Sequence, residues 1–200
     1  MKIVPLVWYD DFVKRFYIWV KLVDIQQDLQ DTVLFLQQFI DQVDLGLSVQ
    51  GLSDDDFESI VRDNRTVLNW LGKHGHYLHK DSFHLGFRLV SESQIDGAML
   101  GVYAALDGHL HIFLIESLVR ENRKHPLNGR LTTLVVIAAT YFLALREESV
   151  GVYVVQPHRD LIQHYEQFGF EVTSGEDLAM YASYESLQDA QQRIITELLG

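Results

Sequence analysis

The order of the apolar segments between residues 109 and 155 restricts the fold more than any other feature of the sequence. A β-type run, HLHIFLIESLV, is followed by a polar loop, an apolar helical run at 131–146 and a second β-type run at 150–155. A strand, a helix and a strand in this order make a right-handed crossover, so the two strands are expected to be parallel neighbours. The sequence therefore predicts an α/β fold with a mixed central sheet flanked by helices.

Two further β-type runs precede this unit and predict an antiparallel meander. They are FHLGFRLV and AMLGVYAAL, and turn-rich segments separate them from each other and from the next run. The Asp107-Gly108 pair is a strong hairpin signal. After the crossover we expect a helix from about Pro157 to Phe168, a strand around residues 178–184 and a terminal helix at 186–200.

The first third of the chain is expected to be a mainly helical extension. Apolar residues recur at three- and four-residue spacing through 25–43, which predicts an amphipathic helix; they are Ile25, Leu29, Val33, Leu36, Ile40 and Val43. A second helix is expected to begin at Ser53, which can form a capping box with Asp56. We expect this helix to run to about Leu71.

Composition favours one domain, residues 1–200, with a mainly helical part at 1–80 and the meander and core at 81–200. With 48% hydrophobic residues the chain can bury one sizeable core. The 16 Lys and Arg against 28 Asp and Glu give a net charge of -12, which repels phosphate backbones and anionic headgroups. Nucleic acids and membranes are therefore not expected as partners.

Three features of other protein classes are absent from the sequence. The chain has no cysteine, so disulfides, thiolate nucleophiles and thiolate metal sites are excluded. The longest apolar stretch, 131–145, contains three threonines and is shorter than the roughly 20 residues that span a bilayer. The first residues reach Asp10 and Asp11 before a signal-peptide core can form. We expect a soluble, cytoplasmic protein.

The polar loop before the apolar helix has features of a phosphate-binding turn. A strand ends in Leu118-Val119, and Lys124 and Gly129 follow five and ten residues beyond Val119. Backbone amides at a helix N-terminus can point at a pyrophosphate, provided that no side chain blocks its approach. Leu127 stands where a glycine would serve best, and the neighbouring cations can compensate with charge; they are Lys124, His125 and Arg130.

A second motif, QPHRDLIQHYEQFGFEV, follows the last strand of the crossover. Together with the loop and the order of elements, it makes residues 112–170 resemble the core of the GNAT N-acetyltransferases. In that family a helix ends in a tyrosine followed shortly by Gly-Phe, and Tyr165, Gly169 and Phe170 match in spacing and order. The resemblance implies that Tyr165 faces the sulfur of coenzyme A and protonates its departing thiolate.

The resemblance also implies a cofactor, a reaction and a set of binding residues. Acetyl-CoA is the expected co-substrate, held at Leu118, Val119, Lys124, Leu127, Asn128, Gly129 and Arg130. The reaction is direct attack of a small-molecule or peptide amine in a ternary complex, without a covalent intermediate. One alternative is an inactive domain of this fold that binds acyl-CoA or a protein partner. Another is an interaction protein, possible as a homodimer, that pairs through the helix at 25–43.

Glu116 and a group of histidines are the acceptor-side candidates. Glu116 lies on the strand before the loop, where a base could deprotonate the amine, and the alternative is a structural carboxylate paired with Arg120. The histidines at 74–84 follow no familiar ligand spacing, so surface or acceptor-pocket positions are expected rather than a metal site; they are His74, His76, His79 and His84.

Overall fold

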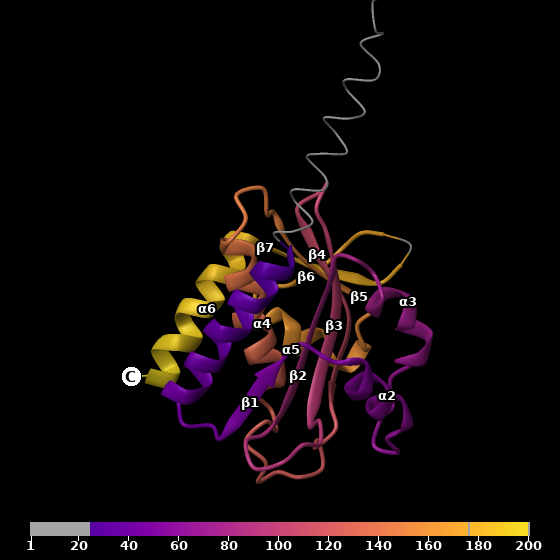
Figure 1. Cartoon of the computed structure of the whole chain (residues 1–200). Helices are drawn as coiled ribbons and strands as arrows, with labels where there is room; N and C mark the ends of the chain where they lie inside the picture. Colours follow the sequence, from indigo (N-terminus) through magenta and orange to yellow (C-terminus); the bar gives the residue numbers. More distant parts are fainter. Residues whose placement is uncertain (1–24, 176, 200) are drawn as a thin grey trace, which may run out of the picture.

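A seven-stranded mixed sheet with helices on both faces forms the centre of the computed structural model, which describes residues 25–175 and 177–199 (Figure 1). The strand order is β1-β2-β3-β4-β5-β7-β6. The strands are β1 (Leu47–Gln50), β2 (Ser82–Leu89), β3 (Gly97–Ala104), β4 (His109–Ser117), β5 (Gly151–Val155), β6 (Glu171–Val172) and β7 (Ala179–Ser183). The helices are α2 (Asp54–Arg62), α3 (His74–Tyr77), α4 (Leu131–Ala144), α5 (Ile162–Glu166) and α6 (Tyr184–Leu199), with short 3-10 turns at Leu71–Lys73 and Arg159–Leu161.

The meander and the crossover predicted from the sequence are confirmed. β2, β3 and β4 pair in antiparallel order, and Gly108 takes a left-handed φ of 68° in the turn before β4. α4 then carries the chain to β5, which pairs in parallel with β4. Helix α4 is apolar nearly all round, because it lies between the sheet and the helices outside it.

The two faces of the sheet have separate cores. On one side, here called the α4 face, α4, α5, α6 and a helix at 25–42 pack on the sheet around buried residues such as Phe83, Ile112 and Phe142. On the other, the α2 face, α2 and α3 pack around Phe57 and Trp70. Figure 1 shows these two layers to the left and right of the sheet.

The apolar stripe of the helix at 25–42 packs against the rest of the same chain. Ile25, Leu36 and Ile40 are fully buried against the α4 face. Arg146, after α4, donates to Asp28 at 2.9 Å and ties this helix to the core. The apolar stripe of this helix therefore lies in the core of its own domain. Among the helices that the structure describes within 1–80, only α2 and α3 lie on the α2 face.

The second predicted helix begins as expected and is shorter than expected. Ser53 and Asp56 form the capping box, but α2 ends at Arg62 instead of near Leu71. Asp63 turns the chain by accepting from the backbone and the guanidinium of Arg65, and the Thr66 hydroxyl donates to the carbonyl of Ile60, which also accepts from the Asp63 amide. Such local side-chain bonds compete with helix continuation.

Strand β1 and the start of α5 also differ from expectation. β1 has four residues and lies in a stretch read as a connection between helices. Residues 157–158 are extended, and the chain passes through the 3-10 turn before α5 begins at Ile162, so the predicted helix at 157–168 is shorter. Within the described residues, no helix combines the length and apolarity needed to cross a membrane.

Candidate active site

Strands β4 and β5 separate halfway along β4. Their pairing runs from His109↔Gly151 to Ile112↔Val154, and β4 then continues to Ser117 without a β5 partner among the described residues. The register between β3 and β4 shifts by one residue at this point, because Gly101 pairs with Ile112 and Leu100 with Leu114. Phe113 therefore has no residue opposite it and forms a bulge. The slot between the two strands is defined by this end of the pairing, and β4 leads from it into the loop at 118–130.

The N-terminus of α4 offers unpaired backbone amides next to this slot. The amides of Gly129, Leu131, Thr132 and Thr133 donate to no described residue, and no side chain caps the helix. Gly129 has a left-handed φ of 73°, and no atom lies within 4 Å of where its Cβ would stand. Amides and a helix dipole directed into open space make an anion site.

Four cations lie in the same loop, all with exposed side chains: Arg120, Arg123, Lys124 and Arg130. The chain has 16 Lys and Arg in total and a net charge of -12, so this is a local basic patch on an acidic protein. Arg130 donates to the Pro126 carbonyl, and Asn128 donates to the carbonyls of Val119 and Arg120 and closes the turn. The charge fits a phosphate-bearing ligand.

Leu127 and His125 face inward from this loop. Leu127 is fully buried and packs beside Gly97, so its side chain leaves the space in front of the amides open. His125 is also buried; its Nδ1 accepts from the Leu127 amide, and its Nε2 lies 3.3 Å from Asp96. These two residues therefore anchor the loop to β3. The sequence motif did not indicate this role.

Leu118 and Val119 are buried at the end of β4. The Leu118 amide donates to the Asp96 carbonyl, while the Val119 amide donates to no described residue. Lys124 is exposed, and its backbone amide bonds to the side chain of Asn122.

Tyr165 lies on α5, and its ring is buried in the core of the α4 face. Burial raises the pKa of its phenol, so it stays protonated at neutral pH. Its hydroxyl has no hydrogen-bond partner among the described residues and is not among their fully enclosed polar atoms. The phenol is thus a free donor on the helix after β5.

Glu116 lies on the α2 face, where both carboxylate oxygens are engaged. One accepts from the amides of Val67 and Leu68 at 2.6 and 3.3 Å, and the other accepts from Trp70 Nε1 at 2.7 Å. Arg120 lies 3.7 Å away. These contacts favour the structural alternative: the carboxylate positions the segment between α2 and α3.

A pocket of about 460 Å³ lies on the α2 face beside the bulge. Phe113 and His111 of β4 form one wall, and His76 and His79 of the α3 region form the other. His84, by contrast, is a structural group whose Nδ1 accepts from the Leu52 amide. Of the histidines at 74–84, two therefore line a cavity next to the strand gap.

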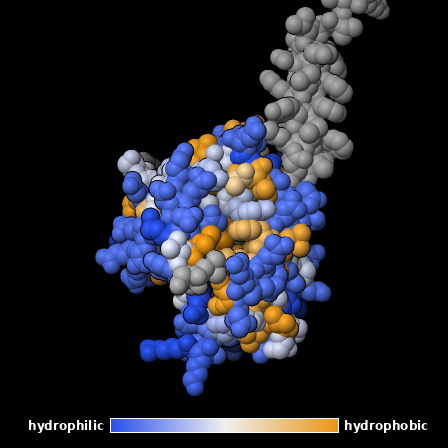
Figure 2. Space-filling view, turned by 90° about the vertical axis from the view of Figure 1, so that its left-hand side faces the viewer, coloured by the Kyte–Doolittle hydropathy of each residue, from blue (hydrophilic) through white to orange (hydrophobic). Residues whose placement is uncertain are grey.

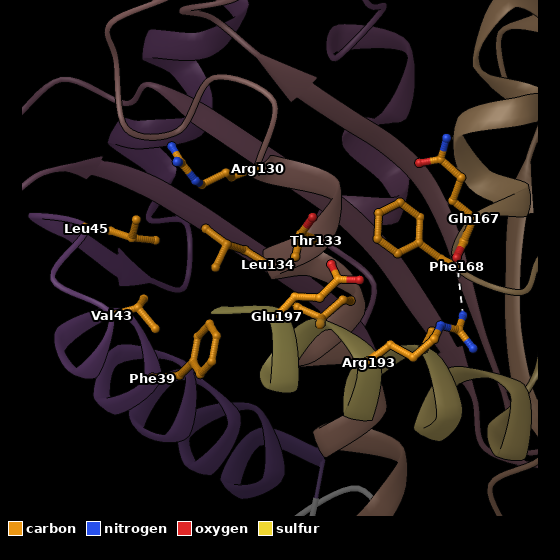
Figure 3. A pocket seen from close by; sticks show the side chains of 12 residues that line it. Phe39, Val43, Leu45, Arg130, Thr133, Leu134, Gln167, Phe168, Arg193 and Glu197 are labelled. Atoms are coloured by element: carbon orange, nitrogen blue, oxygen red, sulfur yellow. Dashed lines mark hydrogen bonds between the residues drawn. The ribbon is translucent and has the colours of Figure 1, made fainter. Parts of the chain in front are cut away.

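A second cavity of about 470 Å³ opens on the α4 face beside Arg130 (Figure 3). Phe39, Leu134 and Phe168 line it, and Arg130 and Arg193 stand at its edge. Figure 2 shows this side of the molecule, which is hydrophilic apart from apolar patches near its middle. Sequence patterns could not indicate this cavity, because its walls come from segments that are far apart in the sequence, at 39–45, 130–134, 167–168 and 190–197.

Comparison with known proteins identifies the fold. No protein-family model matches the sequence, and no curated protein matches it either. An uncharacterised protein from Bacillus halodurans matches in structure with TM-score 0.55 and 9% identity, over 76% of this chain and 91% of that chain. A mutant of spermidine N-acetyltransferase SpeG from Vibrio cholerae matches with TM-score 0.52 and 13% identity, over 72% and 96%. The fold is that of the GNAT N-acetyltransferases.

Proposed function

We propose that this chain transfers the acetyl group of acetyl-CoA to an amine. The observation that carries the proposal is the set of four amides at the start of α4 that have no partner among the described residues, and we propose that they face the slot between β4 and β5. A pyrophosphate at these amides would leave the pantetheine arm to follow the free edge of β4. The thioester then reaches the bulge at Phe113, next to the pocket on the α2 face.

Each predicted binding residue has a place in this proposal. Gly129 and Asn128 shape the turn, Lys124 and Arg130 add positive charge, and Leu127 holds the turn to the core. Leu118 and Val119 end the strand, and the free Val119 amide is proposed to polarise the thioester carbonyl. The cavity beside Arg130 is proposed to hold the adenosine end, because an apolar slot adjoins the phosphate site there.

The proposed reaction needs two proton movements. The nitrogen lone pair of the neutral amine attacks the thioester carbonyl carbon, the C–S bond breaks and the amide forms. The attacking nitrogen loses a proton to a base or water, and the departing thiolate gains one from the Tyr165 hydroxyl. Glu116 takes no proton here, since its oxygens already hold the backbone and Trp70, and its proposed role is to position the acceptor-side segment.

The first test is whether acetyl-CoA stabilises the protein. A ligand at about 100 times its Kd adds about 2.7 kcal/mol to the free energy of unfolding, which raises the Tm of a domain of this size by about 5–10 °C. Differential scanning fluorimetry with acetyl-CoA measures this shift. No shift at millimolar acetyl-CoA would contradict the proposal and leave the fold intact.

Gly129→Ala tests the phosphate cradle, and Gly46→Ala is its matched control. Both glycines have left-handed φ values, 73° and 63°, and both have open space around the added Cβ. Each substitution should therefore cost a similar 1–2 kcal/mol or so of stability. Only Gly129→Ala places a methyl group in front of the amides, so it alone should weaken acetyl-CoA binding, by about tenfold. Equal affinities for the two variants in isothermal titration would refute the cradle.

A further inference from the structure

Aromatic rings line the α2 face where β4, β5 and β7 lie side by side. We call this set the aromatic platform; it consists of His76, His109, His111, Phe113, Tyr153 and Tyr181. His76 lies 4.1 Å from Phe113, His111 stacks on Tyr153 at 5.1 Å, and Tyr153 lies 4.9 Å from Tyr181, measured between ring centroids. All six side chains are half-buried, so their faces are partly available to a ligand.

The platform begins at the strand gap. Phe113 is the bulge residue, and His111 pairs directly with Tyr153 one step before β4 and β5 separate. A thioester in the gap would therefore meet an acceptor lying on these rings. Flat ligands gain most from such a surface, because offset and edge contacts between aromatic rings add to simple apolar burial.

The charges around the pocket disfavour a polycation. Among the described residues that line it there is no Asp or Glu. The Lys73 ammonium lies 5.2 Å from the centre of the Phe113 ring. The nearby carboxylate of Asp81 is 4.0 Å from Lys80 and from His79, so it already faces two nitrogen groups.

The two histidines that flank Phe113 add no charge to the pocket. Burial, followed by the charges of Lys73 and His79, lowers the pKa of His76, and burial followed by His109 lowers that of His111. Both imidazoles are therefore neutral at pH 7. The carboxylates of Asp107 and Glu185 act on His111 and Tyr181 of the platform, and neither residue lines the pocket.

We infer that the acceptor is a monoamine with a flat aromatic body, and that polyamines are excluded. This inference rests on the proposed function, because it names the substrate class of the same site. A monoamine that binds in its reactive, neutral form leaves no charge in the pocket. A polyamine would bring further ammonium groups to a site with Lys73 and no lining carboxylate, and unpaired charges there are costly.

Binding of three amines to the full chain in the presence of CoA tests the inference. The probes for isothermal titration are 2-phenylethylamine, the equally sized but puckered 2-cyclohexylethylamine, and spermidine. We expect 2-phenylethylamine to bind at least tenfold more tightly than spermidine and several-fold more tightly than the cyclohexyl compound. Spermidine binding as tightly as 2-phenylethylamine, equal binding of the two ring compounds, or no binding of 2-phenylethylamine would each overturn it.

Variants of Phe113, which lines the pocket, and of Lys73, which lies over the Phe113 ring, sharpen the test. Phe113→Leu keeps an apolar side chain and removes the ring, so it should weaken 2-phenylethylamine about three- to tenfold and leave spermidine unchanged. Lys73→Gln removes one like charge and should strengthen spermidine binding by up to about tenfold. Arg62→Gln, which removes an exposed cation of α2 that does not line the pocket, is the matched control and should change neither affinity. Equal effects of Lys73→Gln and Arg62→Gln would count against the inference.

The outcomes separate this inference from the proposed function. If acetyl-CoA stabilises the protein and spermidine is acetylated in preference to 2-phenylethylamine, the acceptor class is wrong and the acetyltransferase stands. If acetyl-CoA neither binds nor reacts, the proposed function fails. The same three titrations without CoA then still decide whether the platform selects a flat monoamine.

Discussion

Tyr165 has one atom with one proposed task, so it gives the sharpest test at the scale of a single residue. Tyr165→Phe keeps the buried ring and its packing with Phe170, and removes only the hydroxyl. We expect acetyl-CoA affinity to stay nearly unchanged and kcat to fall about 10²- to 10⁴-fold. Steady-state kinetics with a responsive amine measure this, and a variant that keeps more than about half of kcat would remove Tyr165 from the mechanism.

Individual roles in the site were predicted only as far as local sequence determines them. Tyr165 could be placed near the end of a helix from its spacing to Gly169, and Gly129 could be placed in a turn, because a helix end and a left-handed turn are local features. The engagement of Glu116 could not, because its partners Val67 and Trp70 are nearly fifty residues away in sequence. The direction of the Leu127 side chain also depends on distant residues. The sequence suggested that this side chain blocks the phosphate turn, whereas it lies in the core.

At the scale of elements, the start of α2 depends on the reciprocal bonds of its capping box. Burial alone would raise the pKa of Asp56, but hydrogen bonds from the Ser53 backbone and hydroxyl, the charge of Arg88 and a hydrogen bond from Gln50 outweigh it, so the pKa lies below its usual 3.8. The carboxylate therefore stabilises the fold above pH 3.8, and this contribution is lost as the pH falls through the lowered value.

Asp56→Asn should expose this dependence. At pH 7 we expect a loss of about 1 kcal/mol in the free energy of unfolding, typical of a helix cap. The difference from the wild type should begin to shrink as the pH falls below 3.8, where the carboxyl of the unfolded wild-type chain becomes neutral, and it should disappear below the lowered pKa of the folded state. Thermal unfolding between pH 7 and pH 3 measures it, and a difference that stays constant over this range would rule out the charge as its source.

Elements with a clear period and a clear start were predicted, while those defined by distant partners were not. The capping box at Ser53 and the period of 25–43 gave two helices, because both signals lie within a few residues of each other. Strand β1 has four residues, and it is a strand because β2 pairs with it over Leu47↔Leu89 to Gln50↔Gly86. The end of α2 likewise depends on local bonds of Asp63 and on the distant Glu116.

On the scale of the whole molecule, one buried ion pair joins the N-terminal helix to the end of the crossover. Arg146 and Asp28 lie 2.9 Å apart with side chains only 4% and 16% exposed. We expect Asp28→Asn to cost about 1–3 kcal/mol and to lower the Tm by about 2–12 °C. Arg62→Gln is the matched control, since its pair with Glu58 is exposed and should be worth at most about 0.5 kcal/mol. Equal Tm losses in the two variants would contradict this assignment.

The bulge at Phe113 sets a constraint on how the chain can change in length. Before it, Leu110 and Ile112 face the core of the α4 face; after it, Leu114 and Leu118 face the core of the α2 face. The one extra residue of the bulge therefore exchanges the two faces of the strand, and all residues of β4 after Phe113 depend on it for the face on which their side chains lie. Loss of one residue there would swap the carboxylate of Glu116 with the methyl groups of Ile115, whereas the neighbouring loops can lengthen freely. A lineage of such proteins could therefore vary in its loops while β4 keeps its residue count.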